Sequence, residues 1–352
     1  MRKLYMLLVA LFLVFGLAAC GENGAIDFPE FDEDNIVELS SQDMIELFQN
    51  IDYEAVDSES MKIATKGHVF TKSASDPEET EYTYNEETNI TIDAVFYALV
   101  SETIADVKGF AEGTIEVKRV NEAWYNEKAE NMEISGSMGA YFTGGYLYLM
   151  VDGTYKDGEE AAEEANFKEK MNEQVTQAMW DDVFAQADPE QIDDMIPQEY
   201  LDMLENGELD EIMEAIPNLK VYQDGDTYSI VFAITKQLAL DSLEDIIVAY
   251  AEAMGEEITQ AEIDEMIEEA ETQINDMVDE LVFTYVISIK GNRVIQMAEK
   301  LVFKSVDGNI DIDLTTVIEM DVELPKFPSD LDEYEPVDEF GADLNDLSSA
   351  KS

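Results

Sequence analysis

The chain has 352 residues, of which 46% are hydrophobic and 10% aromatic, so it can bury a substantial core and is not globally disordered. Its 81 Asp and Glu residues outnumber its 20 Lys and Arg residues, which gives a formal net charge of -61. A surface this acidic repels phosphate backbones and excludes nucleic acid as a partner. One Cys excludes a disulfide framework, and one Cys with one His leaves no ligand set for zinc.

The first residues have the pattern of a secretion signal. Arg2 and Lys3 precede an apolar run over residues 4–15. As a helix, this run would span about 18 Å, which is shorter than the roughly 30 Å hydrocarbon core of a bilayer. We therefore expect residues 1–19 to be a signal peptide and not a membrane span.

The apolar run is followed by Leu17-Ala18-Ala19-Cys20, which resembles the lipobox of bacterial lipoproteins. The resemblance implies cleavage before Cys20, a diacylglyceryl thioether on its sulfur, and acylation of the new amino terminus, for example with palmitate. Two or more acyl chains give stable anchoring, whereas one gives marginal binding. The expected location is the extracytoplasmic face of the cell membrane. The alternative is a secreted protein in which Cys20 is incidental.

Composition divides the remainder into three parts. Residues 20–35 are expected to be a flexible acidic tether, residues 36–324 a single α+β domain, and residues 325–352 an acidic, disordered tail. Four apolar residues in the tail could instead form a short motif for a protein partner, namely Phe327, Leu331, Tyr334 and Phe340.

The body begins with a short predicted helix near residues 36–51, and its pattern changes to period two from Met61 onward. Apolar and polar residues alternate over 90–96 and 111–118, and residues 141–151 are β-rich with an interruption at Gly144-Gly145. These segments predict long, half-buried strands of an antiparallel sheet.

Residues 159–217 are predicted to be a helical insertion punctuated by Pro189, Pro197 and Pro217. Hairpin turns are then predicted at Asp224-Gly225, Gly291-Asn292 and Asp307-Gly308, with helices near 238–251 and 259–280 between the first two turns. The expected fold class is α+β, a curved antiparallel sheet or half-barrel with helices packed on its concave face.

This plan is similar to the LolA/LolB and LppX/LprG group of periplasmic carriers and lipoproteins. In that group a curved half-barrel wraps helices and opens a hydrophobic cavity for acyl chains, which implies a lipid ligand here. The similarity lies in the architecture and the lipobox, and Cys20 is the only functional residue that it assigns.

No catalytic motif is present. The chain lacks a G-x-S-x-G elbow, a P-loop, a G-x-G-x-x-G after a strand and H-E-x-x-H. With this many acids, carboxylate pairs recur by chance at every spacing, so they do not indicate a glycosidase. His68 alternates with Lys62 and Lys66, which predicts an exposed strand position where basic residues pair with neighbouring acids; contact with an anionic ligand is the alternative. We expect no enzyme, no cofactor and no dedicated metal site.

The segment after residue 306 partly matches a calcium loop. Asp307, Asn309 and Asp311 fit its first ligand positions, but Ile312 replaces the required Gly and Ile318 the bidentate Glu. The alternation around Ile310 and Ile312 favours a half-buried strand, although the acidic surface could bind divalent cations diffusely.

The predicted helix at 259–280 combines an apolar stripe containing Met266 and Met277 with nine acids and no basic residue. Like-charge repulsion should destabilise it, so we expect the fold to require salt or divalent cations. The Met-bearing stripe fits ordinary core packing better than the lining of a lipid cavity.

Two functions fit these observations. The first is a membrane-anchored, non-catalytic lipoprotein that binds or carries an apolar ligand such as a lipid, and the second is a surface scaffold, sensor or adhesin that acts through protein partners without a ligand cavity. We favour the first on architecture; it predicts a deep apolar pocket.

Overall fold

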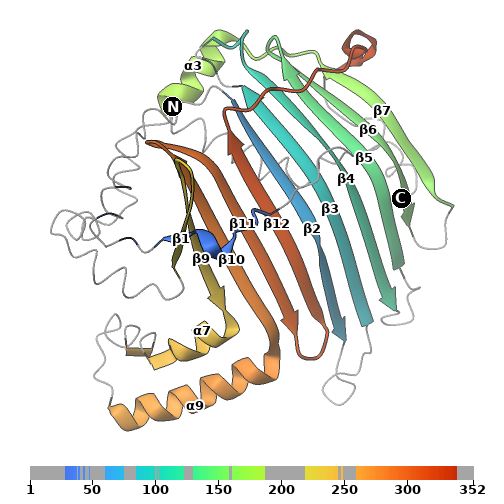
Figure 1. Ribbon diagram of the computed structural model, residues 1–352. Helices are drawn as coiled ribbons and strands as arrows, with labels where there is room; N and C mark the ends of the chain where they lie inside the picture. Colours follow the sequence, from blue (N-terminus) through green and yellow to red (C-terminus); the bar gives the residue numbers. More distant parts are fainter. Residues whose placement is uncertain are drawn as a thin grey trace.

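The computed structural model describes residues 28–37, 39, 43, 47, 60–74, 85–99, 101, 103–122, 130–157, 161–186, 219–244, 247–248 and 259–338. Its main feature is one sheet of 13 strands in the order β1-β8-β9-β10-β11-β12-β2-β3-β4-β5-β6-β7-β13. Figure 1 shows that the sheet is broad and curved and that its two edges do not meet. The predicted curved antiparallel sheet is therefore confirmed.

The strands of this sheet are long in its central part. They are β1 (Ile36–Val37), β2 (Ser60–Ala74), β3 (Asn85–Leu99), β4 (Lys108–Glu122), β5 (Glu130–Thr143), β6 (Tyr146–Asp157), β7 (Glu163–Met171), β8 (Lys220–Asp224), β9 (Thr227–Thr235), β10 (Val278–Lys290), β11 (Arg293–Ser305), β12 (Ile310–Met320) and β13 (Glu335–Val337). Neighbouring strands are antiparallel, except that β13 runs parallel to β7.

The register places apolar and charged side chains on opposite faces, because successive residues of a strand point to opposite sides. One row of paired residues that crosses the sheet defines what we call the apolar face: Ile287, Met297, Ile318, Ile63, Phe96, Ala111, Ala140 and Leu149. The adjacent row defines the charged face: Ser288, Gln296, Glu319, Lys62, Tyr97, Phe110, Tyr141 and Tyr148.

All three predicted hairpins are confirmed. Gly225, Gly291 and Gly308 adopt φ values of 62°, 62° and 68° in the turns that join β8 to β9, β10 to β11 and β11 to β12. Glycine tolerates this left-handed conformation without a steric penalty. Gly144 and Gly145 form a further turn with φ values of 60° and 79°, so the β-rich stretch around them is two strands, β5 and β6.

Helices lie mainly at the ends of the strands. The described α-helices are α3 (Gln177–Gln186), α7 (Lys236–Asp241) and α9 (Gln260–Met277), and short 3-10 helices cover Glu33–Asn35 and Leu331–Glu333. In Figure 1, α7 and α9 lie together where β9 ends and β10 begins, and α3 lies at the opposite end of the sheet. These three helices do not cover the middle of either face.

The predicted helical insertion at 159–217 is partly wrong. Residues 163–171 form β7, while α3 is helical as predicted and residues 187–217 lie outside the described part. One side of β7 is polar, and the other side carries Ala165, Phe167 and Glu169. Because Glu169 interrupts the apolar side, the alternation of apolar and polar residues in this strand is weak. In the predicted helix at 36–51, residues 36–37 form β1, and Asp43 and Leu47 are helical.

The N-terminal segment lies on the charged face. Phe28 and Phe31 pack against Val286, Ala298 and Val317 of three adjacent strands. The expected flexible tether at 20–35 is therefore docked from residue 28 onward, because its two aromatic side chains bury apolar surface on the sheet. Residues 20–27 lie outside the described part.

The first half of the acidic tail is also ordered, which corrects the prediction of a disordered segment over 325–352. Phe327, Leu331 and Tyr334 pack against an aromatic cluster on the charged face, and residues 335–337 extend the sheet as β13. Tyr334 is only 4% exposed. Residues 339–352, with Phe340, lie outside the described part.

Candidate functional site

The apolar face is the first candidate for a binding surface. On β3 alone, five successive positions on this face are apolar: Ile90, Ile92, Ala94, Phe96 and Ala98. These positions cover about 27 Å at 3.3–3.4 Å per residue. One leaflet of a hydrocarbon core is about 15 Å thick, so the apolar run is long enough to lie along an acyl chain.

Part of this face is well packed and part is not. The rows near α3 form a buried core around Met61, Phe96 and Ala111. Farther from α3, a row that crosses the six adjacent strands from β10 to β4 stays only half-buried. Its members are Phe283, Leu301, Leu314, Gly67, Ile92 and Ile115, with Gly67 of β2 between Leu314 and Ile92. Half-buried apolar side chains in a continuous row can accept an apolar ligand.

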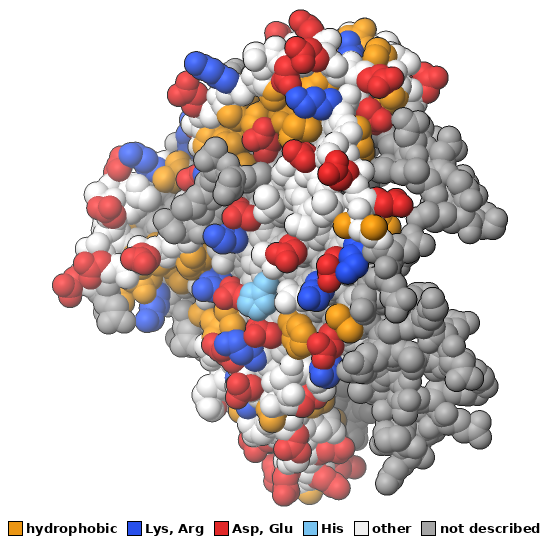
Figure 2. Space-filling model, turned by 90° about the vertical axis from the view of Figure 1, so that its right-hand side faces the viewer, with side chains coloured by type: hydrophobic (Ala, Val, Ile, Leu, Met, Phe, Trp, Pro, Cys, Tyr) orange, Lys and Arg blue, Asp and Glu red, His pale blue; other side chains and the backbone are white. Residues whose placement is uncertain are grey.

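The charged face carries most of the lysines of the central strands, and several of them are paired with acids. Lys62 Nζ lies 2.7 Å from Glu319, Lys66 Nζ lies 3.7 Å from Asp93, and His68 Nε2 lies 3.5 Å from Asp311. Figure 2 shows this face, where the single histidine lies among alternating basic and acidic side chains. The prediction that His68 occupies a strand among basic residues paired with acids is confirmed.

The partial calcium motif is a turn followed by a strand, as the alternation predicted. Asp307 accepts hydrogen bonds from Ser305 Oγ and from the backbone and side chain of Asn309. These hydrogen bonds lower the pKa of the Asp307 carboxyl. Residues from Ile310 onward belong to β12, and among the described residues no three His, Cys, Asp or Glu side chains form a metal-binding group.

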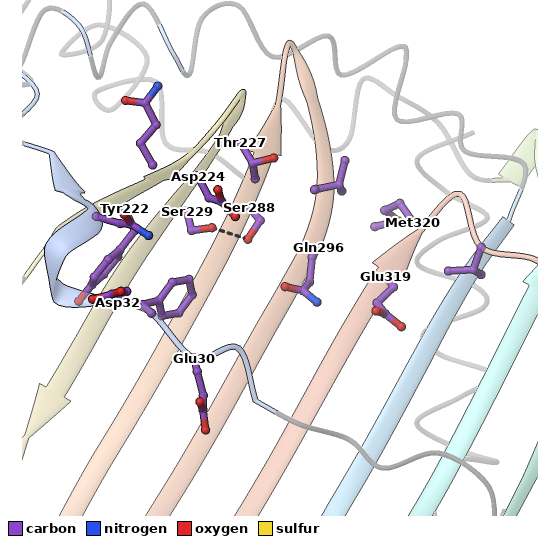
Figure 3. Close-up of a pocket in the computed structure, with 15 residues that line it drawn as sticks. Glu30, Asp32, Tyr222, Asp224, Thr227, Ser229, Ser288, Gln296, Glu319 and Met320 are labelled. Carbon is purple, nitrogen blue, oxygen red and sulfur yellow. Dashed lines mark hydrogen bonds between the residues drawn. The ribbon is translucent and has the colours of Figure 1, made fainter.

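A polar pocket of about 520 Å³ lies on the charged face, at the end of the sheet where β8 turns into β9 (Figure 3). Four segments meet there: the N-terminal segment, the β8–β9 hairpin, the ends of β10 and β11, and the end of β12. Its lining includes Glu30, Phe31, Asp32, Tyr222, Asp224, Thr227, Ser229, Ser288, Gln296, Glu319 and Met320. Sequence reasoning missed this pocket, because its residues are far apart in the chain and share no spacing pattern.

The inner wall of the pocket is polar but neutral. Ser288 is 4% exposed, and its hydroxyl lies 2.9 Å from that of Ser229. Glu319 is held by Lys62 at 2.7 Å, whereas Glu30, Asp32 and Asp224 at the rim are exposed. The ring of Tyr222 stacks on Phe31 with centroids 4.8 Å apart, so the N-terminal segment forms a fixed wall.

Cys20 lies outside the described residues, so the structure places no atom of the predicted anchor. No described helix is both long and apolar enough to cross a membrane.

No family model matches the chain, and no curated protein matches its sequence significantly. Among solved structures, the chain is similar to a beta-barrel-like protein of domain of unknown function DUF1849 from Brucella abortus. The identity is 7%, the match covers 74% of this chain and 97% of that one, and the TM-score is 0.17.

Proposed function

We propose that the chain is a non-catalytic lipoprotein, anchored through Cys20 on the extracytoplasmic face of the cell membrane, that binds an apolar ligand such as a lipid on its apolar face. The half-buried row from Phe283 to Ile115 is the observation that carries this proposal. We further propose that helices pack over the concave side of the sheet and enclose the ligand there.

The distribution of charge supports an interior role for the apolar face. The paired lysines and acids are gathered on the opposite face, which is therefore suited to water. Apolar surface that is not fully packed is favourable only if another apolar group removes it from water. An acyl chain meets this requirement without needing any polar partner on the sheet.

The test is native mass spectrometry of the full chain extracted in detergent, followed by organic extraction and identification of the released lipids. We expect a non-covalent lipid at a fixed stoichiometry. A denaturing measurement of the same sample separates this ligand from lipid attached covalently to Cys20.

Two variants of adjacent residues on β4 assign the ligand to one face. Ile115 is half-buried on the apolar face, and Thr114 is exposed on the charged face. Ile115→Asp should abolish lipid retention and Thr114→Asp should leave it unchanged, with both variants folded by circular dichroism. A chain that carries no lipid, even after incubation with membrane lipids, would contradict the proposal and favour the scaffold, sensor or adhesin function.

A further inference from the structure

The polar pocket on the charged face has unsatisfied hydrogen-bonding capacity. Ser229 and Ser288 share one hydrogen bond between their hydroxyls. One of the two O–H groups donates in that bond, so the other has no acceptor among the described residues. The side-chain amide of Gln296 likewise makes no hydrogen bond to any described residue, although Gln296 is only half-exposed and lies beside Ser288 across β10 and β11.

These groups face the same space. Figure 3 shows the two serine hydroxyls pointing toward each other, with Gln296 beside them and Met320 and Glu319 on the next strand. A buried or half-buried polar group without a partner costs free energy. A ligand that supplies both donors and acceptors would remove this cost.

The charge of the pocket decides the class of ligand. No lysine or arginine lines it, so it offers an anion no partner. The inner wall of the pocket also offers a cation no free negative charge. Ser229, Ser288 and Gln296 are neutral, and Glu319 is paired with Lys62. The unpaired carboxylates lie at the exposed rim, where water competes with any ion pair.

The shape and apolar parts of the lining narrow the class further. A volume of about 520 Å³ lies in the range of small-molecule sites. The stacked rings of Phe31 and Tyr222 add apolar surface to the hydroxyl and amide groups. Pyranose rings present this combination, with apolar C–H faces and a rim of hydroxyls that both donate and accept.

We propose that this pocket binds a neutral saccharide of one or two rings. The site is on the opposite face from the proposed lipid surface and does not depend on it. The hydroxyls of Ser229 and Ser288 and the amide of Gln296 hydrogen-bond the sugar hydroxyls, the Tyr222 and Phe31 edge contacts a ring, and the rim carboxylates accept from outward-pointing hydroxyls.

The experiment is saturation-transfer NMR and titration calorimetry of the full chain in a detergent without a sugar headgroup, against a panel of neutral mono- and disaccharides. Putrescine, spermidine and inorganic phosphate form the counter-panel. We expect saturable binding of at least one saccharide. Binding of a polyamine alone, or no saturable binding of any saccharide, would overturn the proposal.

Variants tie the binding to the pocket. Gln296→Ala should weaken affinity about tenfold, as expected for loss of one or two hydrogen bonds, and Ser288→Ala provides a second test if it folds. Gln237→Ala on α7 and Ser137→Ala on β5 are matched controls outside the pocket and should bind normally. Ile115→Asp should also bind the sugar normally, so failure of lipid binding and failure of sugar binding are separable. Binding that Gln296→Ala leaves unchanged places the sugar elsewhere and overturns the assignment.

Discussion

Gly136 of β5 and Gly153 of β6 are paired on the apolar face so closely that a Cβ on Gly136 would lie 2.7 Å from the Cα of Gly153. No flexible side chain can move away, because the contact is with backbone. Gly136→Ala should therefore lower the free energy of unfolding by about 1–3 kcal/mol, measured by urea denaturation.

The matched control for this prediction is Ser137→Ala, one residue further along β5 on the charged face. Its hydroxyl makes only a long, 3.5 Å contact with the carbonyl of Asp152. We expect a change within about 0.5 kcal/mol. Equal effects of the two substitutions would argue against the close approach of β5 and β6.

Two tyrosines in the aromatic cluster should respond differently to loss of their hydroxyls. Tyr141 donates to Glu112 at 2.7 Å, whereas the buried Tyr334 hydroxyl has no partner among the described residues. Tyr141→Phe should destabilise the fold by about 1–2 kcal/mol, and Tyr334→Phe should be neutral or stabilising. Urea denaturation of both variants tests the difference; a larger loss for Tyr334→Phe would contradict it.

The same tyrosines predict a loss of stability at alkaline pH. Burial, with Asp330 and Glu112 nearby, raises the pKa of Tyr334 from 10.0 to about 12, and burial with the Glu112 hydrogen bond raises the pKa of Tyr141 further. Between pH 10 and pH 12 the unfolded chain releases the Tyr334 phenolic proton, whereas the folded chain retains it. The stability that the neutral Tyr334 phenol contributes is therefore complete below pH 10 and is lost as the pH rises toward 12.

Thermal melts from pH 9 to pH 12 measure this loss. Tyr334→Phe should lose less stability over that interval than the unmodified chain, because its phenol no longer titrates. Identical pH profiles for the two chains would show that the Tyr334 phenol titrates normally.

Salt should stabilise the protein. The exposed surface of α9 carries acids and no base, and Met266 and Met277 are 42% and 57% exposed, so packing holds this helix weakly. Salt screens like-charge repulsion and also weakens the surface ion pairs. At a net charge of -61, the relief of repulsion is the larger of these two effects.

We expect the melting temperature to rise by several degrees between 0.02 M and 0.5 M NaCl, concentrations chosen to span Debye lengths of about 20 Å to 4 Å. Magnesium should act at lower concentration, and an unchanged melting temperature would contradict the prediction.

Membrane attachment should depend on a single sulfur atom. Cys20→Ser removes the thiol that would form the thioether, so it should abolish incorporation of labelled palmitate. Processing of the precursor at residue 19 should fail with it. Labelling that survives the substitution would show that lipid is attached elsewhere.

The sheet could be predicted from sequence where its signals are local. The turns at Gly225, Gly291 and Gly308 were found because adjacent Asp or Asn residues mark tight hairpins. The long strands were found because their alternation is regular. Neither signal requires knowledge of distant contacts.

The features that were missed depend on contacts between distant residues. Tyr334 docks on Tyr148, 186 positions earlier in the chain, and nothing in an acidic segment marks that pairing. Strand β7, which lies next to the edge strand β13, is mostly polar, so its alternation is weak and the sequence predicted a helix there. The pocket beside Ser288 is formed partly by the N-terminal segment, which lies over strands that come much later in the chain. No spacing pattern in the sequence indicates that contact.

Docking of Phe28 on the sheet also determines how far the folded body can move. Eight chain steps separate Cys20 from Phe28, and a fully extended backbone of that length spans about 28 Å. This is less than the 40–45 Å total thickness of a bilayer. With the proposed anchor at Cys20, the sheet stays beside its own membrane, so a bound lipid would be exchanged locally with that bilayer or with a visiting protein, and it would not be carried across the envelope.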